Sequence, residues 1–219
     1  MPLRQAISAA TAVSRIPDGS SVMIGGFMGV GTPNRMIDAL VQSEARNLTV
    51  IANDAGLPGV GIGKLVSAGA IRHLTASHIG LNSEAQAQLN SGKMHVDLVP
   101  QGTLVERIRA GGVGLGGILT ETGIGTEVAD GKDVIEIDEK RYLVERPLRA
   151  EFALIAARRS DYVGNLDYVL TAQNFNPVMA LAADAVIAEA ESIVPVGVIP
   201  PDAVRTPGAL VDYILERAR

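Results

Sequence analysis

The sequence predicts an α/β protein: an open, mostly parallel sheet covered by helices, with a small β-hairpin excursion, in a single domain spanning residues 1–219. First, short apolar segments rich in β-branched residues alternate with amphipathic segments, which is typical of a helix-covered parallel sheet. Second, 21 of the 24 glycines lie at or before Gly131, several of them between a strand and a helix. Third, 219 residues suffice for one domain with a sizeable core.

Composition disfavours several classes of protein. The 19 basic and 24 acidic residues give a net charge of −5, and aromatic residues are few, so a nucleic-acid partner is not expected. Charged residues interrupt every apolar run, so no membrane span or targeting segment is expected either. The lack of cysteine excludes disulfides and thiol nucleophiles, and it favours a cytoplasmic location.

The first half of the chain predicts strands and helices in alternation. Apolar residues at helical spacing predict an opening helix that stops near residue 17: Leu3, Ala6, Ile7, Ala10 and Val13. A strand at 21–24 then enters a glycine loop, followed by a helix with Thr32 as its N-cap and Pro33 as its first residue. The remaining elements are strands at 48–51, 71–76 and 95–99, and helices at about 64–67, 83–89 and 103–109.

The second half predicts fewer helices. Residues 111–131 lack periodicity and predict a long glycine-rich loop. A hairpin follows, with strands at 134–137 and 142–145. The last predicted elements are a strand at 152–156, a turn at 161–165, a helix at 177–183, a strand at 185–188 and a final helix near 209–216.

The first glycine loop gives the best functional signal. Parallel sheets bind ligands beyond the carboxyl ends of their strands, where this loop, Asn53 and His78 all fall. A loop between a strand and a helix offers unpaired N–H groups to a phosphate or to a thioester carbonyl. A tight turn without any ligand is the alternative.

Two nucleotide-binding motifs are not supported. Gly112–Gly117 has the form G-x-G-x-x-G, but it follows a predicted helix and lies in mid-chain, so it does not indicate a dinucleotide site. Gly63-Lys64 is followed by Leu65, so the P-loop motif is absent.

The remaining candidate groups point to no metal site or nucleophile. His73, His78 and His95 form no pair at i, i+4, and we expect core or surface histidines and no metal; His78, at a strand end, is kept as a pocket candidate. Glu121, in the long loop, could serve as a nucleophile or base. A solvated loop carboxylate is the interpretation we prefer.

Residues 18–33, Asp-Gly-Ser-Ser-Val-Met-Ile-Gly-Gly-Phe-Met-Gly-Val-Gly-Thr-Pro, resemble the signature of the family I coenzyme A transferases. The resemblance continues across nearly the whole chain, at 53–56, 100–104, 106–109, 111–112, 122–126, 164–165 and 174–176. Within the family, the chain most resembles the alpha subunits of the short-chain enzymes, those acting on acetate and acetoacetate.

The resemblance implies a covalent mechanism. In the family, a glutamate attacks the acyl-CoA thioester, which forms a mixed anhydride and releases the CoA thiolate. The thiolate then attacks the glutamyl carbonyl, giving an enzyme–CoA thioester and freeing the first acid, and the second acid runs the same steps in reverse. That glutamate belongs to the beta half, in a Ser-Glu-Asn-Gly motif that this sequence lacks. The resemblance therefore implies coenzyme A as co-substrate, a separate beta subunit that carries the nucleophile, and an α2β2 assembly.

The resemblance also assigns site residues. The loop would contact coenzyme A, with glycine letting the cofactor and the partner's backbone approach closely, through Gly25, Gly26, Phe27, Met28, Gly29, Val30 and Gly31. Asn53 would stabilise the thioester oxyanion with its side-chain amide, the alternative being a structural strand-end cap. Gln101, Thr122 and Gly123 would line the acyl pocket.

Two other classes of function stay open at this point. A sugar-phosphate isomerase-like enzyme would need a basic group near the loop, where Lys64 is the only nearby lysine. A non-catalytic module that binds acyl-CoA is the second. The sequence leaves the preferred acid open, since partner residues line part of the pocket; acetate, acetoacetate, butyrate and 3-oxoadipate are the candidates.

Overall fold

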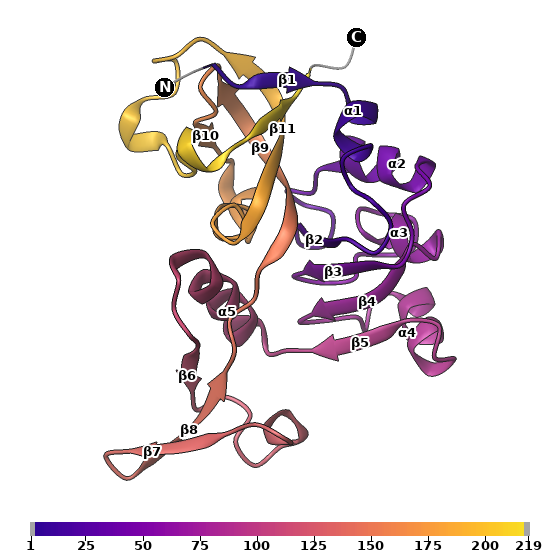
Figure 1. Ribbon diagram of the computed structural model, residues 1–219, viewed down its shortest axis with the longest axis vertical. Coiled ribbons are helices and arrows are strands. Elements are labelled where there is room, and N and C mark those ends of the chain that lie inside the picture. Colours follow the sequence, from indigo (N-terminus) through magenta and orange to yellow (C-terminus); the bar gives the residue numbers. More distant parts are fainter. Residues whose placement is uncertain (1–2, 217–219) are drawn as a thin grey trace.

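The computed structural model describes residues 3–216, so the predicted domain bounds at 1 and 219 lie outside this range. Its main sheet has the strand order β1-β12-β11-β9-β2-β3-β4-β5, and every neighbouring pair along this path is parallel (Figure 1). β10 adds an antiparallel strand to β9. The strands are β1 (Gln5–Ile7), β2 (Ser21–Ile24), β3 (Leu48–Ala52), β4 (Ile71–Ala76), β5 (His95–Leu98), β9 (Ala150–Asp161), β10 (Leu166–Asp167), β11 (Ala183–Val194) and β12 (Tyr213–Leu215).

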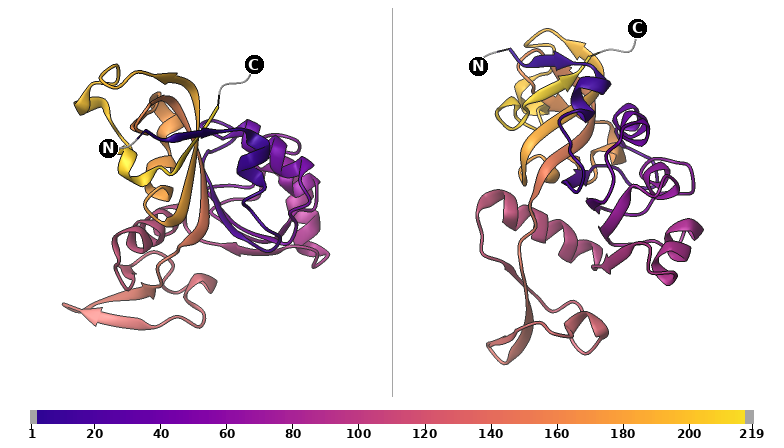
Figure 2. Two further views of the ribbon diagram at one scale, coloured as in Figure 1. Left: turned by 45° about the horizontal axis from the view of Figure 1, so that its top comes forward. Right: turned by 45° about the vertical axis from the view of Figure 1, so that its right-hand side comes forward.

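Helices cover both faces of the sheet (Figure 2). β2 shows that both faces of the sheet are buried. Its alternate residues Val22 and Ile24 pack into the core under the first four helices, whereas Met23 packs into the core on the opposite face. Strands buried on both faces read as continuous apolar runs, which made them visible in the sequence. The first face carries α1 (Ala9–Val13), α2 (Asn34–Gln42), α3 (Gly63–Ser67) and α4 (Ser83–Asn90), and the second carries α5 (Gln101–Val113) and α6 (Asn176–Met179).

A three-stranded antiparallel arm projects from one end of the molecule (Figure 1). It consists of β6 (Ile118–Thr120), β7 (Val134–Ile137) and β8 (Lys140–Glu145), and the short 3₁₀ helix η1 (Glu127–Ala129) lies between β6 and β7. Glu145 is 2% exposed, and its carboxylate lies 2.5 Å from Lys132 Nζ and 3.6 Å from Arg107 Nη1. This ion cluster ties the arm to α5.

Most predicted elements are confirmed. The strands at 21–24, 71–76 and 134–137 are as predicted, the second hairpin strand begins two residues earlier than predicted, and several other strands extend beyond their predicted ends, above all β9 and β11. The predicted loop over 111–131 is wrong in part, because α5 continues to Val113 and the range also contains β6 and η1. Within residues 3–216, no helix has the length and apolar character that a bilayer crossing needs.

The predictions for the two ends of the chain were wrong. The predicted opening helix is divided into β1, which pairs with β12, and α1, which Ser8 caps by accepting a bond from Thr11 N. The predicted final helix is instead the 3₁₀ turn η4 (Gly208–Leu210) followed by β12, which lies between β11 and β1. Pairing between the two ends of the chain overrides the local helical pattern in both places.

Two helix boundaries also differ from expectation. Thr32 is not the N-cap of α2: that position belongs to Pro33, which makes no side-chain cap bond. The N–H groups of Arg35 and Met36 instead donate to the carboxylate of Glu189, on β11. The predicted helix at 177–183 is reduced to the short α6, because β11 already begins at Ala183.

Glu145→Gln should destabilise the protein by about 3 kcal/mol, because it leaves Lys132 and Arg107 without their buried counter-charge. Glu121→Gln is the matched control on the same arm, since Glu121 is exposed and lies 3.8 Å from Lys140 Nζ. The control should change stability little. Urea unfolding of both variants measures the difference, and equal effects would contradict the assigned role of Glu145.

A candidate active site at the carboxyl ends of the strands

A hollow of about 590 Å³ opens beyond the carboxyl ends of β2 and β3. The start of α5 and the segment 171–175 close its other sides. None of its lining residues carries a formal charge: Phe27, Met28, Val30, Asn53, Gln101, Gly102, Val105, Thr171, Asn174 and Phe175. The hollow therefore offers apolar surface with a few neutral polar groups, a composition typical of small-molecule sites.

Asn53 directly follows β3 and is 3% exposed. Its Oδ1 accepts hydrogen bonds from Gln101 Nε2 at 2.8 Å and from Ser77 Oγ at 3.0 Å. Because both donors use the oxygen, the Nδ2 group is directed elsewhere, and within residues 3–216 it has no hydrogen-bond acceptor. Asn53 thus lines the hollow with a neutral side-chain amide whose orientation these two bonds fix.

The glycine loop, residues 25–31, is held by two polar side chains. Asp54 accepts a bond from Met28 N at 3.0 Å, which supports a methionine in the left-handed region, at φ +52°. Asn174 accepts from Gly26 N at 3.1 Å and donates through Nδ2 to Val30 O at 3.1 Å. These bonds fix the loop tip, where Phe27 and Val30 stay partly exposed.

Glycine in this loop makes room for the chain's own atoms. A Cβ on Gly25 would lie 1.7 Å from Asn176 Oδ1, and one on Gly31 would lie 2.2 Å from Ala172 O. Asn176 is fully buried, donates to Gly31 O at 2.9 Å and accepts from Ala156 N at 3.0 Å. The explanation expected from the sequence, close approach by cofactor or partner, is therefore not needed at these two positions.

Asp54, which binds Met28 N of the glycine loop, is 3% exposed. Burial raises the pKa of its carboxyl, and the N–H groups of Met28 and Gly56 and the nearby His78 act in the opposite direction. His78 itself is exposed and lies outside the lining of the hollow. Its contact with the site runs through the backbone, where Ala55 N donates to His78 O at 3.0 Å.

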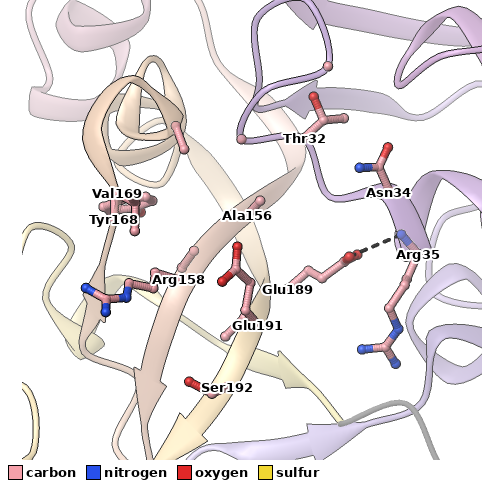
Figure 3. Close-up of a pocket in the computed structure, with 15 residues that line it drawn as sticks. Thr32, Asn34, Arg35, Ala156, Arg158, Tyr168, Val169, Glu189, Glu191 and Ser192 are labelled. Carbon is pink, nitrogen blue, oxygen red and sulfur yellow. Dashed lines mark hydrogen bonds between the residues drawn. The ribbon is translucent and has the colours of Figure 1, made fainter.

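A second hollow of about 730 Å³ lies between α2, β9 and β11, and Gly29 and Gly31 of the glycine loop line it (Figure 3). Glu189 reaches into it and binds the start of α2. Partial burial raises the pKa of its carboxyl, and the two α2 N–H groups oppose that shift. The sequence analysis missed Glu189; three carboxylates (Asp184, Glu189 and Glu191) within the alanine-rich strand β11 are the only local signal, and they do not single out Glu189.

The structure brings together five of the predicted site residues. Phe27, Met28, Val30, Asn53 and Gln101 all line the first hollow. Asn174 and Phe175 join them; they were part of the resemblance but were not assigned to the site, although the polar run 173–176 marked the place.

The other predicted residues lie elsewhere. Gly25 and Gly26 support the loop without lining either hollow. Thr122 and Gly123 lie in the arm, after β6, and do not line the hollow in this chain, so their role in an acyl pocket stays a prediction. Glu121 is an exposed arm residue.

Residues 6–217 match the coenzyme A transferase family, and the chain belongs to that family. Its relatives there include alpha subunits. It is 53% identical over 198 residues to the acetate CoA-transferase subunit alpha of Escherichia coli, covering 90% of each chain. It is 49% identical over 199 residues to the acetoacetyl-CoA:acetate/butyrate CoA transferase alpha subunit of Clostridium acetobutylicum, covering 91% of each.

Solved structures show the same fold. An acyl-CoA transferase from E. coli O157:H7, in a thioester complex with CoA, superposes with a TM-score of 0.88 at 25% identity. The match covers 98% of this chain and 47% of that one, so this chain spans about half its length. Glutaconate CoA-transferase from Acidaminococcus fermentans gives a TM-score of 0.83 at 17% identity, over 96% of this chain and 75% of that one, which shows the fold alone. The predicted family and fold are confirmed.

Gly31→Ala should destabilise the protein far more than Gly59→Ala. Both glycines have left-handed backbones, with φ of +69° and +70°, so an alanine costs about 1–2 kcal/mol at either position. A Cβ on Gly59 meets open space, whereas a Cβ on Gly31 meets Ala172 O. Urea unfolding tests the difference, and equal costs would show that the loop is not clamped against residue 172.

Proposed function

We propose that this chain is the alpha subunit of an α2β2 enzyme that moves coenzyme A between a short-chain acyl-CoA or 3-oxoacyl-CoA and a carboxylic acid. The reaction would pass through a glutamyl–CoA thioester on the beta subunit. Membership of the coenzyme A transferase family and the alpha-subunit names of its relatives support this proposal. The family match also favours a transferase over the sugar-phosphate isomerase and over the non-catalytic binding module.

The main observation behind the proposal is that Asn53 and the tip of the glycine loop line the same hollow. When a carboxylate attacks a thioester carbonyl, negative charge develops on the carbonyl oxygen. The Nδ2 group of Asn53 is a neutral donor whose orientation is fixed beforehand by Ser77 and Gln101. Such a donor stabilises the developing charge with little reorganisation, and in a desolvated site the interaction is strong.

The lining of the hollow also favours a class of acid. Phe27, Val30, Val105 and Phe175 supply apolar surface, and within the described part of the chain no lysine or arginine lines the hollow. A short acid with one carboxylate, such as acetate, butyrate or acetoacetate, suits this lining better than a dicarboxylate such as 3-oxoadipate. A dicarboxylate would need a cation for its second charge, and the beta subunit would have to provide it.

The residues 25–31 are proposed to contact coenzyme A, with Phe27, Met28 and Val30 at the accessible tip. Gln101 positions Asn53 and lines the acyl side of the hollow. The roles of Thr122 and Gly123 and the cytoplasmic location stay predictions. The arm that carries Thr122 and Gly123 projects from the sheet, where a partner subunit could bring them to a shared site.

The division of labour can be tested by reconstitution with the beta chain. The purified alpha chain should show no transferase activity, the mixture should be active with ping-pong kinetics, and static light scattering should give the mass of two copies of each chain. Transfer of CoA by the alpha chain alone would contradict the absence of the nucleophile. A panel of mono- and dicarboxylic acids, assayed on the mixture, tests the proposed acid class.

Asn53→Ala should lower kcat of the reconstituted enzyme by about 10²–10³-fold, the loss typical of removing one oxyanion donor. Asn90→Ala, at the exposed end of α4, is the control and should keep wild-type activity. Thermal unfolding of both alpha chains checks that they fold. A properly folded Asn53→Ala enzyme with unchanged kcat would limit Asn53 to capping the end of β3.

A further inference from the structure

The edge of the main sheet brings together two histidines and an aspartate. β5 is the last strand of the sheet and pairs in parallel with β4 (Figure 1). In this register His73 lies directly opposite His95. Asp97, two residues further along β5, projects on the same face as His95. The opposite face of these strands, with Leu74 and Val96, packs into the core under α3 and α4.

The three side chains converge with their ligand atoms. His73 Nε2 lies 2.8 Å from Asp97 Oδ2, and His95 Nε2 lies 3.2 Å from Asp97 Oδ1. The two imidazole rings meet edge to face, with centroids 4.7 Å apart. One potential ligand atom from each of the three residues lies within 4.8 Å of the others.

This spacing suits a tetrahedral metal ion. Zinc binds imidazole nitrogen and carboxylate oxygen at about 2.0–2.2 Å, so neighbouring ligand atoms around it lie about 3.3 Å apart. The two nitrogen–oxygen distances at the sheet edge are close to that value, at 2.8 Å to Asp97 Oδ2 and 3.2 Å to Asp97 Oδ1, and the chosen ligand atoms of all three residues lie within 4.8 Å of one another. Since the paired strands hold the three backbones in place, any adjustment to the ion falls to the side chains.

The donor set also selects the kind of ion. Two imidazole nitrogens and one carboxylate oxygen suit zinc and its neighbours among the transition metals, whereas magnesium and calcium prefer oxygen alone. The His73, His95 and Asp97 side chains are 33%, 69% and 51% exposed, so a hydrated ion can reach them. Three protein ligands leave a fourth position for water.

We propose that His73, His95 and Asp97 form a binding site for a zinc-like divalent transition-metal ion that clamps the edge strand β5 to β4. The site is separate from the proposed active site, because none of the three residues lines the hollow at the carboxyl ends of β2 and β3. It also differs from the sequence expectation of no metal. The spacing of the histidines along the chain indicated no metal-binding pair, but the register of β4 and β5 places His73 beside His95.

Zinc titration of the tag-free full-length chain, freed of metal by a chelator, tests the proposal by calorimetry. We expect one zinc ion per chain and no comparable binding of magnesium. His73→Gln, His95→Gln and Asp97→Asn should each weaken zinc binding by at least about tenfold, since even losing an outer-shell contact commonly costs 10–100-fold. His78→Gln is the matched control, as it changes the chain's remaining histidine outside the cluster, and should bind zinc like the wild type.

Two further readouts separate a built site from surface binding. Zinc should raise the Tm of the wild type and of His78→Gln, but not that of His95→Gln, because a ligand stabilises the state that binds it. Cobalt(II) bound to the wild type should give the visible absorption of a four- or five-coordinate ion. The His73→Gln and His95→Gln variants, which each lack one imidazole, should not give it. Since the His95 side chain is mostly solvent-exposed, His95→Gln keeps the test informative if His73→Gln fails to fold.

The proposal is overturned if the wild-type chain binds no zinc. Binding that persists unchanged in His95→Gln, or that is lost equally in His78→Gln, overturns it as well. In each of these cases the His73–Asp97 and His95–Asp97 contacts are only surface ion pairs.

Discussion

The packing of the glycine loop against the segment 172–176 is the constraint on which the site depends. Asn176 is fully buried, and its amide bonds to Gly31 O, Ala172 O and Ala156 N. A buried amide is stable only when its polar atoms are paired, so the loop must follow the path that pairs them. That path leaves no space for a Cβ at residues 25 and 31, and it sets the position of the loop tip.

The parallel sheet supplies the second half of the arrangement. Because β2 and β3 run side by side in the same direction, the loop and Asn53 emerge at the same edge. Asn53 is then oriented by donors from two other parts of the chain, Ser77 after β4 and Gln101 at the start of α5. The donor is therefore preorganised in a single chain, although the nucleophile is proposed to come from another.

Exposed apolar side chains surround the hollow. Phe27 and Val30 at its rim are 39% and 50% exposed, and Leu57 and Val60 nearby in the chain are 36% and 43% exposed. Water-exposed apolar side chains gathered beside a ligand hollow are typical of a surface that a partner covers. This observation supports the proposal that a beta subunit completes the pocket and brings the glutamate to the thioester.

The sequence by itself determined the strand, glycine loop and helix around residues 21–42, the run of parallel strands, the hairpin and the position of Asn53, because these depend on local periodicity and on where strands end. Tertiary structure decided the rest. The chain ends became β1 and β12 because they pair with each other across the whole sequence, against a local helical pattern. Glu189 meets the start of α2 only because α2 packs beside β11, and His73 meets His95 and Asp97 only through the register of β4 and β5; neither contact is encoded by a local pattern. Even the reason for the glycines came from the fold, since the atoms that exclude a Cβ at residues 25 and 31 belong to Asn176 and Ala172, far along the chain.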